Sequence, residues 1–315
     1  MKTRSYLLIP FLAVLPAVLF AVAALADPLP GEALKFQQLP QNGPEFFGHD
    51  ELSTAYGTLG PNGTFTGQGN FVADDFADKF NSPVVHLRWW GSYLDNQGIT
   101  QGVTHFLISF ESDIPAGPNV PFSRPGEPML NQIVRKGPLA PGSGTFTEVP
   151  VPGGGPEQLF RYNAELHLGK EFRQQPNSVY WLKIVALLDT SSDTVRWGWH
   201  NRDYSLTDPL ASTAPAVNPG EHVEGPTGFP IWHFQDDAVS GRLNVVDNPN
   251  DAVSPFVTQD PGSFAPQRYV AGRDGPALIA DFSKDLAFEL YTVPEPATGV
   301  VFAAGLLLLR RRHGA

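Results

Sequence analysis

The sequence predicts an all-β protein, an antiparallel β-sandwich of jelly-roll-like form with long Pro- and Gly-rich loops. The first observation is that apolar and polar residues alternate with a period of two along the body, while long segments with a 3.6-residue period are absent. The second is that glycine and proline, 31 residues each, cluster between the alternating runs. Ten prolines lie between positions 113 and 156 alone, so we expect loops there. Many short strands joined by such loops are typical of an antiparallel sandwich.

The predicted strands follow one another along the whole body. Leu87 and Trp89 share one face of the first clear strand, which leaves His86, Arg88 and Trp90 on the other. The run 179–188 is apolar at nearly every position, so it predicts a central strand covered on both faces. Further alternating segments cover residues 105–111, 160–168, 195–199 and 286–290.

Residues 1–26 form a candidate signal peptide, which is excluded from fold reasoning. Two basic residues precede an apolar run that ends in a small-x-small triplet, the expected site for signal peptidase. The residues at this cleavage site are Ala24, Ala26 and Asp27. The alternative is an uncleaved N-terminal anchor, because the apolar run is long enough to span a bilayer as a helix.

Residues 293–315 contain three features in order: a Pro-Glu-Pro motif, an apolar stretch and a basic cluster. This tail resembles the PEP-CTERM sorting signal, which bacterial exosortases recognise. The motif residues are Pro294, Glu295, Pro296, Arg310, Arg311 and Arg312. Arginines after an apolar helix hold the end of such a tail in the cytoplasm. The alternative is a buried C-terminal helix, which does not explain why three consecutive arginines follow the apolar stretch.

The resemblance implies cleavage near Pro-Glu-Pro by exosortase and release or attachment at the cell surface. Proteins with this tail often go to extracellular polysaccharide or biofilm matrix. We therefore expect an exported protein of the cell envelope or extracellular surface, held transiently in the inner membrane by the C-terminal helix. That helix is short, since the 13 residues 297–309 extend only about 20 Å against a hydrocarbon core of about 30 Å.

The body between these segments, residues 27–292, is either one domain or two subdomains with a break near 140–156. The two terminal segments contain five of the basic residues and one of the acidic ones, which leaves 16 basic and 31 acidic residues in the body. Such a charge disfavours nucleic acid and anionic lipid, so the C-terminal helix is the only membrane contact we expect. The chain has no cysteine, so disulfides do not brace the body.

Two segments of the body resemble an uncharacterised β-rich domain that accompanies this tail in exported proteins. They are the Ala-Asp-Asp-Phe segment within 71–76 and the Trp-Trp-Gly-Ser-Tyr segment within 84–93. No activity is known for that domain, so the resemblance implies a β-rich fold and nothing about chemistry.

No strong catalytic signature is present, and we expect a non-catalytic protein. The sequence lacks a nucleophile elbow, a phosphate loop, a metalloprotease helix and any cysteine nucleophile. The alternative is a secreted carbohydrate-active enzyme, in which two carboxylates flank a sugar as in a glycoside hydrolase.

Paired aspartates are the candidate metal ligands, with calcium as the candidate ion because calcium takes oxygen ligands. The pairs are Asp74 with Asp75 and Asp236 with Asp237; a third group is Asp247, Asn250 and Asp251. The alternative is that these residues end strands and turns, where aspartate makes local hydrogen bonds to the backbone.

Two tryptophans are candidate carbohydrate contacts. Trp90 lies on the polar side of its strand, and Trp232 adjoins His233, so either indole is positioned to stack on a sugar if exposed. Burial beneath a loop or a second sheet is the alternative. The histidines are spread over different strands and predict solvated faces rather than a metal site.

Overall fold

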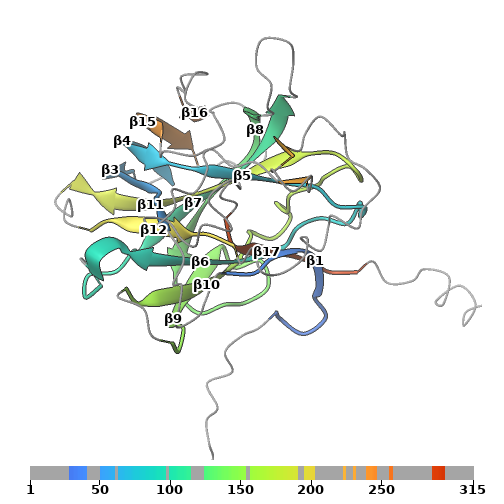
Figure 1. Ribbon diagram of the computed structural model, residues 1–315, viewed down its shortest axis with the longest axis horizontal. Helices are drawn as coiled ribbons and strands as arrows, with labels where there is room; N and C mark the ends of the chain where they lie inside the picture. Colours follow the sequence, from blue (N-terminus) through green and yellow to red (C-terminus); the bar gives the residue numbers. More distant parts are fainter. Residues whose placement is uncertain are drawn as a thin grey trace, which may run out of the picture.

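The computed structural model confirms an all-β chain with almost no helix (Figure 1). The one helix whose bounds lie within the described residues is a short 3-10 turn, η1 (Leu94–Asn96). The structure describes residues 28–40, 50–60, 63–96, 99–114, 124–153, 157–190, 195–202, 223–224, 230–231, 239–246, 255–257 and 286–294.

Seventeen strands are found in these ranges, and fifteen of them form one mixed sheet. The longest path through the sheet runs β1-β17-β6-β10-β9-β8-β7-β11-β3-β4-β15-β16, with β12 paired to β2 and β6, and β5 paired to β11. The strands are β1 (Ala33–Gln38), β2 (Asp50–Leu52), β3 (Thr54–Leu59), β4 (Thr64–Phe71), β5 (Ala73–Phe76), β6 (His86–Tyr93), β7 (His105–Ile114), β8 (Arg124–Lys136), β9 (Thr145–Pro150), β10 (Leu159–Glu165), β11 (Tyr180–Asp189), β12 (Trp197–His200), β13 (Val223–Glu224), β14 (Pro230–Ile231), β15 (Val239–Val246), β16 (Pro255–Val257) and β17 (Phe288–Thr292).

The prediction of a wholly antiparallel sheet is wrong at two places. β11 runs parallel to β3, and β8 runs parallel to β9. The pairing of β8 with β9 is short, from Arg135 opposite Thr145 to Lys136 opposite Phe146, and only residues 137–144 connect the two strands. The pairing of β3 with β11 follows the usual rule that parallel neighbours have a long connection rather than a tight hairpin. More than a hundred residues separate β3 from β11, so the chain has ample length to return in the same direction.

The central strand predicted at residues 179–188 is confirmed as β11, and it separates two apolar cores. Leu182 and Ile184 point into the larger core, while Val185 and Leu187 point into a smaller one on the other face. β7 behaves in the same way, with Leu107 in the smaller core. Both strands are therefore covered on both faces, as a nearly continuous apolar sequence predicts.

Two strands occupy the Pro-rich stretch that was expected to be loops. β8 pairs along β7, and its Pro125 and Pro128 lie where the register shifts, so their missing N–H groups interrupt the ladder at points that are already irregular. β9 pairs with both β8 and β10 and so belongs to the same sheet; it lies within the stretch 140–156, where the sequence left a division into two subdomains open.

The first and last strands of the sheet are neighbours. β17 lies between β1 and β6, and Ala33 at the start of β1 is opposite Thr292 at the end of β17. In Figure 1 the blue strand β1 and the red strand β17 accordingly lie together at one side of the sheet. Segments from opposite ends of the sequence thus complete one edge region of the fold.

Several predicted features lie outside the described residues. These are the signal peptide with Ala24, Ala26 and Asp27, the tail from Glu295 through Pro296 to Arg310, Arg311 and Arg312, and the side chains of Trp232, Asp236 and Asp237. No helix in the described part of the chain is both long enough and apolar enough to cross a membrane.

Candidate functional site

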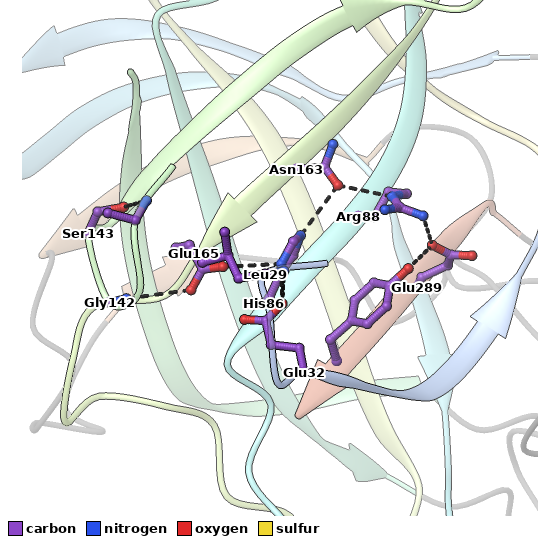
Figure 2. Close-up of polar contacts among 11 residues, drawn as sticks. Leu29, Glu32, His86, Arg88, Gly142, Ser143, Asn163, Glu165 and Glu289 are labelled. Carbon is purple, nitrogen blue, oxygen red and sulfur yellow. Dashed lines mark hydrogen bonds and ion pairs between the residues drawn. The ribbon is translucent and has the colours of Figure 1, made fainter. Parts of the chain in front are cut away.

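The polar face of β6 carries a buried network of charged side chains. His86 and Arg88 point away from the larger core, as their alternation with Leu87 and Trp89 predicts. Both are nevertheless buried, and on this face Glu32 contacts His86 while the ring of Tyr291, from the neighbouring strand β17, packs against both side chains. A buried charge needs partners, and the network supplies them (Figure 2).

His86 lies between two carboxylates that come from different parts of the chain. Its Nδ1 is 2.8 Å from Oε2 of Glu32 and 3.1 Å from Oε1 of Glu165. Glu165 ends β10 and is the cross-strand partner of His86, so the antiparallel register brings these two side chains together. Glu32 precedes β1 and approaches from the N-terminal segment. All three side chains are almost fully buried.

Hydrogen bonds in this group identify the charge state that the surroundings favour. Burial alone lowers the pKa of His86, but its contacts with Glu165 and Glu32 outweigh burial and raise the pKa to about 9. Burial raises the pKa of Glu165, an effect that His86 partly offsets. Nε2 of His86 is 3.3 Å from Oδ1 of Asn163, an acceptor, so the imidazolium form satisfies both ring nitrogens.

The donors and acceptors around His86 are not balanced. Nδ1 carries one proton, and at 2.8 Å that proton is directed at Glu32. Oε1 of the buried Glu165 then has no hydrogen-bond partner, while its Oε2 receives only a long contact of 3.5 Å from the amide of Gly142. A buried carboxylate oxygen without a donor is costly, so a positively charged ligand would be favoured here.

The remainder of the network joins β6 to β17 and β1. Nη1 of Arg88 donates to Oε2 of Glu289 at 2.7 Å, and the hydroxyl of Tyr291 donates to the same carboxylate. Gln37 donates to the other oxygen of Glu289 at 2.5 Å. This carboxylate has its donors supplied from three strands, and its role is structural.

The predicted calcium ligands Asp74 and Asp75 lie within β5 rather than in a turn after it, and both are buried. Oδ2 of Asp74 accepts the main-chain amide of Leu286 at 2.8 Å. This acceptor role is long-range, between residues 212 positions apart, and differs from the local hydrogen bonds of strand ends and turns that the sequence left open for these aspartates. Convergence with Asp236 and Asp237 is untested, since that pair lies outside the described residues.

The hypothesis of an exposed indole at Trp90 is wrong, because this side chain is only 6% exposed. Trp90 is opposite Arg161 of β10, and its main-chain amide reaches the carbonyl of Ala287 at 3.4 Å. Burial, the alternative that the sequence left open for Trp90, is therefore what the structure shows. Trp232, the other candidate, is outside the described part of the chain.

The prediction of solvated histidines fails at two positions. His86 and His200 are both buried, and each contacts carboxylates, with Nδ1 of His200 lying 2.9 Å from Oδ1 of Asp50. His105 remains half-buried, and burial together with the positive charge of Arg135 lowers its pKa. The meeting of His86 with Glu32 and Glu165 depends on strand register, for which the sequence contains no signal.

Comparison with known proteins identifies one family. Residues 34–239 match the family described as "Domain of unknown function (DUF7901)". No curated protein matches the chain, and no solved structure matches it.

Proposed function

The chain belongs to the DUF7901 family, and we propose that it is an exported, non-catalytic protein of the cell surface or extracellular matrix, sorted through its C-terminal tail. Signal peptidase removes the N-terminal segment, and exosortase acts at Pro-Glu-Pro. The body is a jelly-roll-like sandwich that remains outside the cell. The C-terminal helix is its transient anchor in the inner membrane.

The observation that carries this proposal is where the last strand ends. β17 stops at Thr292, and one residue, Val293, separates it from Pro294, the first residue of the Pro-Glu-Pro motif. Val293 is 51% exposed and Pro294 is exposed as well, so the backbone leaves the sheet for solvent at the first residue of the motif. A processing enzyme needs an accessible, extended backbone, and prolines favour that conformation.

The pairing of the first and last strands supports the same arrangement. Because Ala33 is opposite Thr292, the chain enters β1 and leaves β17 at the same end of this strand pair. The segments that precede β1 and follow β17 therefore depart from one region of the body. This suits a body that is held at a membrane through its terminal segments before they are removed.

The non-catalytic part of the proposal is supported by how the buried carboxylates are used. Glu289 neutralises Arg88, and Glu111 neutralises Lys183 at 2.6 Å. Glu32 and Glu165 face one histidine, with no gap between them for a sugar. A glycoside hydrolase needs two carboxylates open to its substrate.

Extracellular polysaccharide is the proposed partner, on the strength of the tail's resemblance. With Trp90 buried, Trp232 is the remaining aromatic candidate for contact with a sugar. Substituting Trp232→Ala should weaken retention of the protein on the native polysaccharide in a pull-down. Unchanged retention would remove Trp232 from the proposal.

The sorting proposal is tested by the intact mass of the native protein in surface and culture fractions, with and without exosortase. We expect a mature form that starts at Asp27 and lacks the residues after Pro-Glu-Pro, and that depends on exosortase. A form that retains Arg310, Arg311 and Arg312 in both strains would contradict sorting and indicate a plain membrane anchor.

A further inference from the structure

We propose that Glu32, His86 and Glu165 form a buried binding site for one divalent transition-metal ion, with zinc as the expected ion. These three side chains offer one nitrogen and two oxygen ligand atoms, all within 4.8 Å of one another (Figure 2). The site is separate from the sorting tail and from the aspartate pairs considered for calcium.

The spacing of the ligand atoms fits a metal ion. With metal–ligand bonds of about 2.1 Å, neighbouring ligand atoms lie about 3.0 Å apart in an octahedral site and about 3.4 Å apart in a tetrahedral one. Nδ1 of His86 is 2.8 Å from Oε2 of Glu32 and 3.1 Å from Oε1 of Glu165. Small side-chain adjustments therefore suffice to admit an ion.

An unsatisfied acceptor is the second observation that indicates a cation. Oε1 of Glu165 faces Nδ1 of His86 and has no hydrogen-bond partner, although the side chain is buried. Two carboxylates compete for the one proton on Nδ1. A metal ion in place of that proton would bind all three atoms at once and leave no acceptor unsatisfied.

The far side of the imidazole has the partner that metal-binding histidines have. Such a histidine usually donates its other ring N–H to an oxygen acceptor, which fixes the ring's orientation. Oδ1 of Asn163 is 3.3 Å from Nε2 of His86, and Nε of Arg88 donates to the same oxygen at 2.9 Å. Arg88 thus holds the acceptor in place, and Glu289 balances its charge.

The ligand types select the class of ion. Calcium and magnesium prefer all-oxygen sites, whereas imidazole suits zinc and other transition metals. Zinc accepts histidine nitrogen together with carboxylate oxygens and is stable outside the cell as a divalent ion. The three protein ligands leave further coordination positions for water or a fourth group.

A bound ion would fasten the N-terminal segment to the sheet. Glu32 lies before β1, and its Oε2 also accepts the main-chain amide of Leu29 at 2.8 Å. His86 and Glu165 belong to β6 and β10, so one ion would join three separate parts of the chain. Binding to the folded state alone raises stability in proportion to RT ln(1 + [L]/Kd), where [L] is the free ion concentration.

The test is zinc titration of the full chain, purified in detergent without a histidine tag and stripped with a chelator. We expect about one equivalent of zinc by calorimetry and a melting temperature that rises by several degrees. Glu165→Gln keeps the shape of the side chain and should weaken binding at least tenfold. His200→Gln is the matched control, because it removes a buried histidine that contacts Asp50, outside the proposed site, and should leave zinc binding unchanged.

X-ray absorption of the zinc-loaded unmodified chain gives a readout that does not depend on whether a variant folds. One imidazole with only oxygen ligands besides it would agree with the proposed site. Two or more imidazoles, no bound zinc, or zinc binding that survives Glu165→Gln would each overturn the proposal.

Discussion

Oδ2 of Asp74 accepts a hydrogen bond of 2.8 Å from the main-chain amide of Leu286, a residue 212 positions later in the sequence. Both residues are fully buried. The contact connects β5 to the residues that lead into β17, so a side chain substitutes for a strand partner at this amide. Asp74 therefore has a structural role as a hydrogen-bond acceptor, whether or not it also binds an ion.

Asp74→Ala should destabilise the protein by about 1–3 kcal/mol in calcium-free buffer, because the buried amide of Leu286 loses its acceptor. Chemical denaturation measures this loss. Asp74→Asn is the matched variant, since it keeps an oxygen acceptor of the same size and should cost less. Equal stability of Asp74→Ala and the unmodified chain would contradict the structural role.

Calcium binding by the aspartate pairs makes a different prediction. If Asp74 and Asp75 join Asp236 and Asp237 around an ion, calcium should raise the melting temperature, and a chelator should reverse the rise. The double substitution Asp236→Asn with Asp237→Asn should abolish the effect. The absence of any calcium-dependent shift would remove calcium from the account of this protein.

Lys183 is the one charged residue in the otherwise apolar run 179–188, and Glu111 explains its presence. Its Nζ is 2.6 Å from Oε1 of Glu111, and both side chains are buried. Glu111→Gln or Lys183→Met alone should cost about 3–5 kcal/mol, because either change leaves a buried charge without its partner. The double variant should recover most of that loss, and denaturation of all four proteins measures the coupling. Additive costs would contradict it.

The pH dependence of stability in chelator-treated protein should report on His86. Its pKa is about 9 in the folded state against 6.5 in the unfolded state, since contacts with Glu165 and Glu32 outweigh burial. The folded state therefore holds this proton more tightly, which contributes on the order of 3 kcal/mol below pH 6.5. The contribution should decline as the pH rises from 6.5 to 9.

Urea denaturation at pH 6 and pH 9.5 measures this change. His86→Gln should flatten this part of the profile, while His200→Gln should retain it. A profile between these values that is the same with and without His86 would show that the pair of carboxylates does not hold the proton.

Phe106 is at the centre of the aromatic packing in the larger core. Its ring centroid lies 4.8 Å from that of Trp197, 4.9 Å from that of Phe146 and 5.2 Å from that of Tyr162. Phe106→Ala should cost about 3–5 kcal/mol, because it removes these contacts and leaves a cavity. Leu168→Ala is the control, since that side chain is 77% exposed, and its effect should be under about 0.5 kcal/mol. Denaturation curves compare the two.

Strand positions were predictable where local pattern and burial agree. The apolar run that became β11 predicted a central strand, and the second core explains why Leu107 interrupts the polar face of β7. The alternation at 160–168 predicted a strand that is longer than the observed one. β10 ends at Glu165, and Leu168 is exposed. Such patterns report which residues are covered, but not by which segment.

The features that the sequence did not predict depend on contacts between segments that are distant in the sequence. β8 was not predicted, because its prolines indicate a loop. A strand nevertheless tolerates proline where its hydrogen-bond ladder is already irregular, as it is in β8. The parallel pairing of β3 with β11 and the meeting of Glu32 with His86 follow from the path of the chain in space. The alternation left both exposure and burial open for Trp90, because it assigns a residue to a face of its strand and does not show whether that face is covered.

The position of β17 also has a consequence for the order of folding. β17 fills the place between β1 and β6, so a chain growing from its N-terminus must leave that place open until residues 288–292 have been made. Direct closure of so long a loop costs on the order of 5 kcal/mol in chain entropy, which favours insertion of β17 as a late step. Until then Arg88 lacks Glu289, and the incomplete sheet exposes two unpaired edges to chaperones and proteases.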